Sequence, residues 1–262
     1  ISQFQLSSKM LGLIASLALC LIPTSLGFAS VATTAAPYSS TAFQSLKKQL
    51  PRDTNVVSCG GWYNLAKFAD DPKGNLVEFI VNNLKSTNSK STELQEESQL
   101  NALLVLLEST KKGFESDLID GDWHVVLTRQ GSKSPKFQKA FARVNAKKGQ
   151  GSSAFDVKTM TFSGTDYTPR GNGVITSSVK YNPVPDNFDV NEKGDIVLRR
   201  IACEITGGSF KYWKLPKVNL PLRRKGGYLD FVYLDKDVRV TKGNRGGVFI
   251  HFRPEFLEKV MA

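Results

Sequence analysis

The chain has 262 residues, 40% of them hydrophobic and 23% charged, which argues against a largely disordered chain and against a multi-span membrane protein. Lys and Arg number 35 against 24 Asp and Glu, so the net charge is +11 and the surface attracts anions such as lipid headgroups, nucleic acid or acidic proteins. The three cysteines (Cys20, Cys59 and Cys203) form no CxxC pair and the two histidines are isolated. We therefore expect no disulfide framework, no metal site and no cofactor.

The N-terminal part of the chain has the pattern of a targeting leader. Residues 11–22 are an apolar run that is shorter than the roughly 20 residues of a membrane-spanning helix, as in the core of a signal peptide. An amphipathic or buried helix is the alternative. The small residues Ser25 and Gly27 predict cleavage before Phe28, so residues 1–27 are expected to comprise upstream residues and a signal peptide.

The next segment has the composition of a transit peptide. Residues 28–50 contain no acidic residue and are rich in Ala, Ser and Thr. A signal peptide followed by Phe28 and such a stretch resembles the bipartite leader of algae with secondary plastids. This resemblance implies a transit peptide over residues 28–52 and import into a plastid (chloroplast).

Two helices are predicted before the strands begin. Residues 53–91 are expected to be an N-terminal extension and linker, with a short helix that begins at Asp71-Pro72 and has apolar residues at helical spacing. A second helix is predicted from Thr92, which has the spacing of a capping box, to about residue 112. Its apolar face consists of Leu100, Leu103, Leu104 and Leu107.

From residue 122 onward the pattern changes to strands. Trp123, Val125 and Leu127 alternate along the first strand and are expected to share one of its faces. Further strands are predicted over residues 155–163, 173–182, 195–206, 228–234, 238–242 and 247–252. About seven or eight antiparallel strands after an N-terminal helix predict a mainly β, lipocalin-like barrel, and a two-sheet sandwich is the alternative. Such a barrel encloses its own side chains or one small hydrophobic ligand.

The C-terminal strands carry a resemblance to a known family. The run LDFVYLDKDVRVTKGNRGGVFI over residues 229–250, together with LIDGDW over residues 118–123, resembles the plastid lipid-associated protein (PAP/fibrillin) family. The motif positions are Gly121, Trp123, Asp235, Arg239, Gly243, Asn244 and Gly246. The resemblance covers about residues 92–255, which we take as the domain, with residues 256–262 as a tail. It implies a lipocalin-like barrel, no catalysis in most members of the family, and association with thylakoids or plastoglobules.

Several residues are expected to meet a hydrophobic ligand inside the barrel: Trp123, Phe231, Tyr233, Arg239 and Ile250. The alternative is that the apolar ones fill the core, with Trp123 as a plug at the barrel floor. Asp235 and Arg239 flank a tight turn, where a bidentate ion pair would lock the hairpin. Here the alternative is a polar group that orients a ligand headgroup. Gly243, Asn244 and Gly246 are expected to be turn residues with a structural role.

Two acid-free basic stretches are candidates for contact with an anionic membrane. Ser134-Pro135 predicts the start of an amphipathic helix with a basic stripe. The predicted membrane contacts are Lys136, Phe137, Lys139, Phe141, Arg143 and Lys147. A helix that caps the barrel with a solvated basic face is the alternative. Residues 210–225 interleave aromatic and basic side chains, which fits a membrane interface or single-stranded nucleic acid.

No GxSxG, P-loop or HExxH motif occurs, so no catalytic residue is assigned. We expect a non-enzymatic plastid protein that binds a lipid or an isoprenoid, such as a carotenoid or a quinone. We further expect it to associate peripherally with thylakoid or plastoglobule membranes. No nucleic-acid partner is expected, but a nucleic-acid-binding barrel and a lipocalin-like enzyme acting on an isoprenoid are the alternatives. The identity of the ligand and the oligomeric state stay open.

Overall fold

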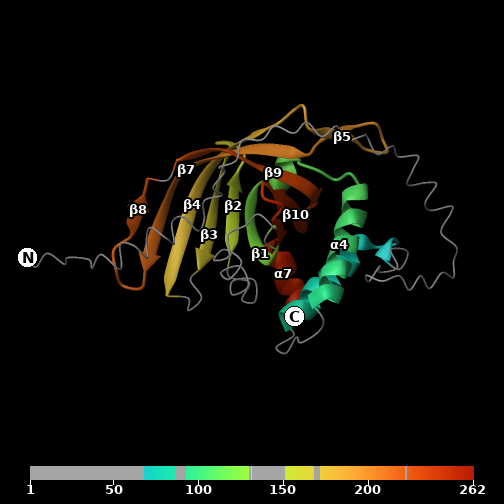
Figure 1. Cartoon of the computed structure of the whole chain (residues 1–262), viewed down its shortest axis with the longest axis horizontal. Coiled ribbons are helices and arrows are strands. Elements are labelled where there is room, and N and C mark those ends of the chain that lie inside the picture. Colours follow the sequence, from blue (N-terminus) through green and yellow to red (C-terminus); the bar gives the residue numbers. More distant parts are fainter. Residues whose placement is uncertain (1–67, 86–92, 130, 132–150, 168–171, 222) are drawn as a thin grey trace, which may run out of the picture.

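The computed structural model describes residues 68–85, 93–129, 131, 151–167, 172–221 and 223–262. These residues form an antiparallel β-barrel with helices along one side (Figure 1). The predicted mainly β fold, a barrel preceded by a helix, is confirmed.

The described helices are α3 (Pro72–Lys85), α4 (Glu93–Ser109), the short α5 (Ser116–Ile119) and α7 (Pro254–Met261). Helix α3 begins where the sequence predicts, because Pro72 occupies the first position and Asp71 Oδ1 accepts a hydrogen bond from the Gly74 N–H at 2.9 Å. Helix α4 buries the predicted leucine face together with Leu106. Both helices thus present an apolar stripe to the barrel.

The strands are β1 (Gly121–Arg129), β2 (Ser152–Asp156), β3 (Thr161–Tyr167), β4 (Gly173–Pro183), β5 (Phe188–Val190), β6 (Ile196–Leu198), β7 (Arg200–Tyr212), β8 (Val218–Leu220), β9 (Arg224–Leu234), β10 (Val238–Gly243) and β11 (Val248–Phe252). Two predicted strands are wrong in extent. Residues 155–163 contain the turn between β2 and β3, where Asp156 Oδ1 accepts hydrogen bonds from the N–H groups of Lys158 and Thr159. The predicted strand 195–206 is divided between β6 and β7.

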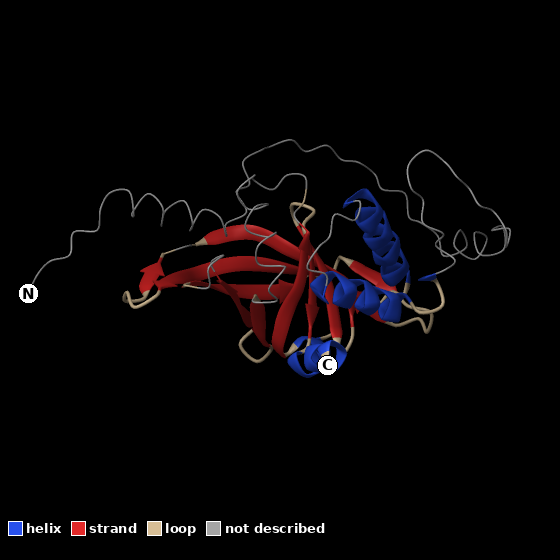
Figure 2. Ribbon diagram, turned by 90° about the horizontal axis from the view of Figure 1, so that it is seen from below, coloured by secondary structure: helices blue, strands red, loops and turns tan. Residues whose placement is uncertain are grey.

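A ring of antiparallel pairings closes the barrel. It runs from β1 through β2, β3, β4, β7, β9, β10 and β11 and back to β1. The β4–β7 pairing joins two strands that are not consecutive in the chain, while β8 extends the edge of β7 and β5–β6 form a separate hairpin. Figure 2 shows the curved strands with the helices gathered at one side of them.

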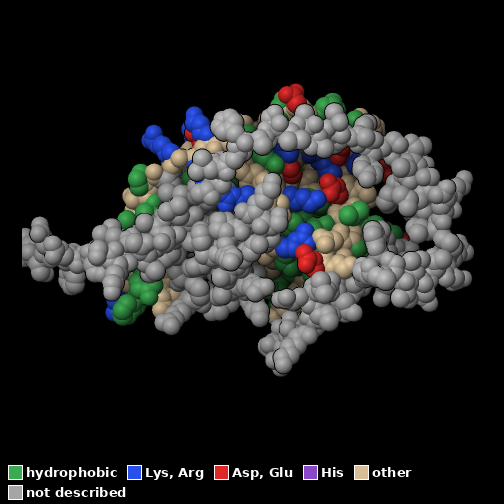
Figure 3. Space-filling view, viewed as in Figure 1, with side chains coloured by type: hydrophobic (Ala, Val, Ile, Leu, Met, Phe, Trp, Pro, Cys, Tyr) green, Lys and Arg blue, Asp and Glu red, His purple; other side chains and the backbone are tan. Residues whose placement is uncertain are grey.

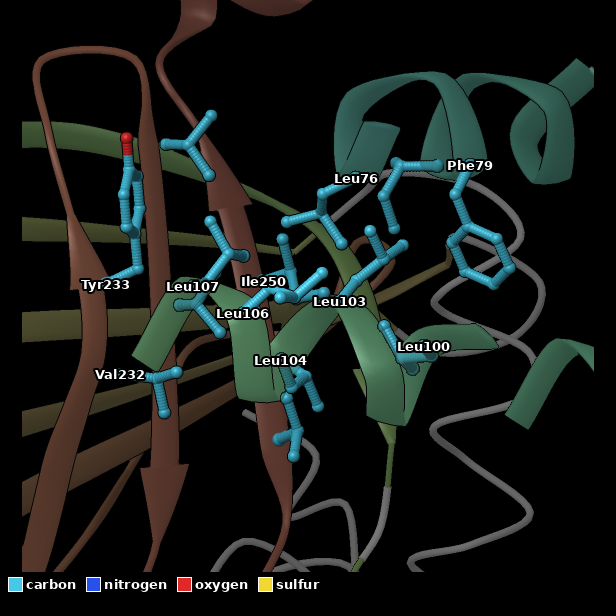
Figure 4. Packing of buried hydrophobic residues seen from close by; sticks show 14 of the residues in the cluster. Leu76, Phe79, Leu100, Leu103, Leu104, Leu106, Leu107, Val232, Tyr233 and Ile250 are labelled. Carbon is cyan, nitrogen blue, oxygen red and sulfur yellow. The ribbon is translucent and has the colours of Figure 1, made fainter. Parts of the chain in front are cut away.

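The barrel wall separates two hydrophobic clusters. The interior cluster joins side chains of β1, β2, β4, β7 and β9, which lie on opposite sides of the ring, to two residues that precede β1: Phe114, Ile119, Trp123, Phe155, Tyr181, Ile201, Phe231 and Leu234. The helix-side cluster joins α3 and α4 to the outer faces of β1, β9, β10 and β11, as Figure 4 shows for Leu103, Leu107 and Ile250. Alternate side chains of these strands therefore belong to different cores.

A register irregularity changes the face that part of β1 presents. The pairing of β1 with β11 shifts between Val125 and Leu127, which is the effect of a β-bulge. Trp123 consequently joins the interior cluster, whereas Leu127 packs against the helix-side cluster. The predicted common face of Trp123, Val125 and Leu127 is therefore wrong for Leu127.

Candidate functional site

Trp123 and Phe231 face the inside of the barrel at the end that α5 closes. Trp123 is fully buried, and its indole Nε1 donates a hydrogen bond to the Ile119 carbonyl at 2.8 Å. The ring of Phe231 lies edge-on to that of Phe114, with 5.3 Å between centroids. Aromatic side chains thus fill this end of the barrel.

Tyr233 and Ile250, which the sequence predicts beside a ligand, lie on the other side of the wall. Both belong to the helix-side cluster (Figure 4). Val240 pairs with Tyr233, but the next residue, Thr241, pairs with Phe231, so β9 contains a bulge and its two aromatic side chains face opposite sides. A ligand inside the barrel would meet neither Tyr233 nor Ile250.

Arg239 directs its guanidinium group into the barrel. The residue is 3% exposed, and its Nη2 donates a hydrogen bond to the Ser153 hydroxyl at 2.6 Å. Its guanidinium carbon lies 4.8 Å from the ring centroid of Phe155 and 5.2 Å from that of Trp123. Nε and Nη1 have no hydrogen-bond partner among the described residues. Burial, and then the like charge of Arg253, hold the pKa of Arg239 well below its ordinary value.

Two more buried polar groups accompany Arg239. His251 is its cross-strand partner on β11, and His251 Nδ1 has no hydrogen-bond partner within the described part of the chain. Burial, and then the charges of Arg239 and His124, keep the pKa of His251 well below its ordinary value, so the imidazole is neutral at pH 7. The Tyr181 hydroxyl, in the interior cluster, is likewise buried without a partner in the described ranges. No sequence motif contains these residues, and only strand alternation relative to Arg239 points to His251.

The barrel interior is more accessible beyond Arg239. Val125, Asp166 and Phe249 face inward by strand register, yet each keeps part of its surface exposed. Ile175 and Phe210 pair across the β4–β7 seam near this end and are buried. Burial raises the pKa of the Asp166 carboxyl. Inward-facing residues at the end away from α5 are thus less completely buried than the aromatic side chains at the α5 end.

The predicted ion pair between Asp235 and Arg239 is wrong, because Asp235 pairs with helix α3 instead. Lys73 Nζ lies 2.8 Å from Asp235 Oδ2 and 2.6 Å from Asp237 Oδ2. The Tyr233 hydroxyl donates to Asp235 Oδ2 at 2.7 Å, and two backbone N–H groups of the turn donate to Oδ1. Burial alone would raise the pKa of Asp235, but these hydrogen bonds outweigh it and the pKa lies below its ordinary value. Strand alternation turns Arg239 inward, away from this network.

The glycine positions of the family motif lie at turns. Gly121 and Gly246 adopt left-handed φ values of 89° and 75°, which an L side chain rarely adopts. The Gly246 N–H donates a hydrogen bond to the Gly243 carbonyl at 2.8 Å and closes the β10–β11 turn that contains Asn244. These residues determine where β1 begins and where β11 returns.

The β7–β8 hairpin presents an apolar and basic tip. Trp213 is 70% exposed and Leu215 is 47% exposed. Lys214 Nζ lies 5.5 Å from the centroid of the Trp213 ring. Figure 3 shows hydrophobic and basic side chains together at the end of the molecule where Figure 1 places β8. The structure therefore exposes Tyr212 and Trp213 of the basic stretch 210–225, whereas Phe210 is buried.

The predicted amphipathic helix that begins at Ser134, with all its membrane-contact residues, lies outside the described residues. Within the described ranges, no helix has the length and apolar character needed to cross a membrane. No group of three or more His, Cys, Asp or Glu side chains in those ranges is arranged to hold a metal ion.

Comparison with known proteins gives a match at the level of the family. The family model described as PAP_fibrillin matches residues 67–251. The match begins just before α3 and ends within β11, so it spans the helices α3, α4 and α5 and all of the barrel but the last residue of β11. No curated protein and no solved structure matches the chain.

Proposed function

The chain belongs to the PAP/fibrillin family, and from this membership we propose that it is a non-enzymatic plastid protein that holds a lipid or an isoprenoid inside its barrel. Membership of this family is consistent with a plastid lipid-associated protein. The observation that carries the proposal is the asymmetry of the barrel interior. Aromatic side chains plug the end at α5, while inward-facing residues such as Val125 and Phe249 stay partly exposed at the other end. Partly exposed apolar side chains inside a barrel suit contact with one hydrophobic guest.

Peripheral attachment to a thylakoid or plastoglobule membrane is the second part of the proposal. The exposed Trp213 beside Lys214 is the combination that anchors proteins at a membrane interface, where the ring enters the headgroup region and the ammonium group meets anionic lipid. The net charge of +11 adds attraction to the same surface. The predicted helix at residues 134–147 is a further contact in this proposal.

Extraction of the purified protein tests the ligand. We expect an organic extract of the folded protein to contain a hydrophobic compound in near-stoichiometric amount, identified by mass spectrometry. Ser177 faces the interior and Ser178 faces outward on the same strand, so Ser177→Phe should displace the compound and Ser178→Phe should not. A folded barrel that carries no compound and takes up no added carotenoid, quinone or fatty acid would refute the proposal.

Sedimentation with vesicles or with RNA separates the membrane from the nucleic-acid alternative. We expect binding to vesicles that contain anionic lipid and none to single-stranded RNA at the same ionic strength. RNA binding without vesicle binding would favour the nucleic-acid-binding barrel, because exposed aromatic and basic side chains also stack on bases.

A further inference from the structure

We propose that the ligand of the barrel is a long-chain carboxylic acid, whose carboxylate binds Arg239 and whose apolar tail runs toward the accessible end. This inference rests on the proposed function, since it requires that the barrel binds a hydrophobic guest, and it adds the chemical class of that guest.

The first argument is the unmet hydrogen-bonding capacity of Arg239. A guanidinium group has five N–H donors, one on Nε and two on each Nη. Nε and Nη1 are buried without a partner among the described residues, so three of the five donors have no acceptor. A buried cation without acceptors is strongly unfavourable, so an acceptor that neutralises it would stabilise the folded protein.

Among the described residues, the surroundings of Arg239 supply no counter-charge. The two aromatic rings beside it interact with the cation through their faces but accept none of the N–H donors in plane. The charged group with a resolved effect on Arg239 is Arg253, which is of the same sign. Asp166 faces the same interior, but no ion pair in the described structure joins it to Arg239. The site therefore has one positive charge to be neutralised.

The neighbouring polar groups complete a carboxylate site. The Ser153 hydroxyl accepts a hydrogen bond from Arg239, which leaves its own proton free to be donated to a ligand oxygen. His251, directly across from Arg239, has a buried Nδ1 without a partner in the described part of the chain. Its imidazole is neutral and can donate one proton to the same anion.

The charge balance selects a monoanion. A hydrocarbon isoprenoid offers no acceptor to the three donors of Arg239, and a neutral carbonyl compound such as a quinone would accept from them but leave the charge unneutralised. A phosphate monoester or a diphosphate ester would place about two or more negative charges against one guanidinium and a neutral imidazole, and the excess charge would be buried. A carboxylate matches both the single charge and the planar arrangement of the donors.

The arrangement of the interior sets the direction of the tail. The aromatic plug of Trp123, Phe155 and Phe231 fills the space on one side of Arg239. On the other side, Val125 and Phe249 face inward and remain partly exposed. A tail that leaves the carboxylate can therefore extend only along this second side.

Delipidated protein should distinguish an acid from its neutral analogue. The probes are hexadecanoic acid and its methyl ester, which share one tail and differ in charge, measured by titration calorimetry or by displacement of a fluorescent fatty acid. We expect the acid to bind about tenfold or more tightly, which is the size of one or two charge-assisted hydrogen bonds. Arg239→Met should abolish this preference, whereas Arg200→Met should preserve it, because Arg200 is paired with Asp230 on the outer face.

Thermal unfolding separates a ligand-binding role from a structural one. We expect the delipidated Arg239→Met variant to be as stable as the parent or more stable, because it removes a buried unpaired charge. Lower stability together with an unchanged preference for the acid would overturn the inference. If the variant does not fold, the comparison of acid and ester on the parent protein still tests whether the barrel prefers a carboxylate.

The two proposals fail in different ways. Equal affinity for the acid and the ester would refute the carboxylate site and leave a hydrophobic barrel intact. Failure of both probes to bind, with carotenoid and quinone also excluded from the folded protein, would refute the proposed function itself.

Discussion

Asp235 and Arg239 lie close together on the β9–β10 hairpin, yet their side chains end in opposite environments. Asp235 accepts hydrogen bonds from Lys73, Tyr233 and two backbone N–H groups, whereas Arg239 enters the barrel and meets one hydroxyl. Two residues of one family motif therefore have different structural roles. Asp235 joins helix α3 to the β9–β10 turn, and Arg239 places a charge inside the barrel with no ion-pair partner among the described residues.

Asp235 predicts a pH dependence of stability. Its folded-state pKa is lowered, so its contribution is present above the unfolded-state pKa of about 4 and is lost as the pH falls through the folded value. We expect Asp235→Asn to reduce the free energy of unfolding at pH 7 by about 2 kcal/mol. We also expect the variant to show a flatter decline between pH 5 and 3 in urea titrations. Asp186→Asn, at an exposed position, is the matched control. Identical pH slopes for Asp235→Asn and the parent would contradict the assigned network.

The buried thiol of Cys203 is expected to resist alkylation in the folded protein. Burial raises the pKa of its thiol to about 12, which a hydrogen bond involving the Leu229 backbone only partly opposes. Because the thiolate is the reactive form, iodoacetamide at pH 8 should leave Cys203 unmodified in the folded protein and modify it within minutes in urea. Peptide mapping by mass spectrometry distinguishes it from Cys20 and Cys59. Rapid native labelling would show that β7 opens or that the interior admits the reagent.

At the scale of elements, β-bulges determine which face of the barrel wall a side chain lies on, which the alternation of residues along a strand does not predict by itself. The run from Phe231 to Tyr233 has the spacing of one strand face, and from the sequence both are predicted to contact a ligand. The bulge in β9 places Phe231 inside the barrel and Tyr233 under helix α4. A bulge depends on the register of the neighbouring strand, so a pattern within one segment does not reveal it.

The β7–β8 hairpin predicts a local change in membrane binding. Trp213→Ala with Leu215→Ala should weaken binding to anionic vesicles about tenfold and leave the melting temperature unchanged, because both side chains are exposed. Phe188→Ala with Ile196→Ala removes comparable exposed apolar surface from the β5–β6 hairpin and is the matched control.

The outcome also separates the two predicted membrane contacts. If the hairpin variant binds normally while Lys139→Glu with Arg143→Glu loses binding at moderate salt, the contact lies in residues 134–147. Loss of binding in both variants would mean that the two segments act together on one surface.

The predicted targeting leader is expected to direct a reporter protein into a plastid. A reporter fused to residues 10–52 should enter a complex plastid, and Phe28→Asp should leave it outside the stroma. The aromatic residue directly after the predicted cleavage site is the feature that motivates the substitution. Normal import of the Phe28→Asp fusion, seen by fluorescence microscopy, would remove the bipartite interpretation.

At the scale of the whole molecule, helix α3 packs into the same hydrophobic cluster as the outer face of the barrel, so we expect the two to unfold together. Leu76 on α3 is fully buried in a cluster that includes side chains of α4, β10 and β11. Leu76→Ala should therefore destabilise the protein by about 2–5 kcal/mol while unfolding stays a single transition in urea. Val105→Ala, exposed on α4, is the control. A separate early loss of helix signal would instead make α3 part of a linker, as residues 53–91 were expected to be.

The sequence by itself determined what depends on short segments. Asp71-Pro72 starts α3 through a local cap, the leucine spacing defines the buried face of α4, and glycine positions mark the β10–β11 turn. The long motif at residues 229–250 pointed to the family that the comparison then matched.

The tertiary structure alone decided which distant groups meet. Lys73 reaches Asp237, 164 positions away in the chain, and Arg239 reaches Ser153, 86 positions away. The pairing of β4 with β7 closes the barrel and so determines which faces of the strands lie inside it. The bulges in β1 and β9 then place individual residues in the other hydrophobic cluster than simple alternation predicts. Such contacts result from the register of the whole ring, and no window of the sequence contains both partners. For this reason the buried charge of Arg239 emerges only once the barrel is closed around it.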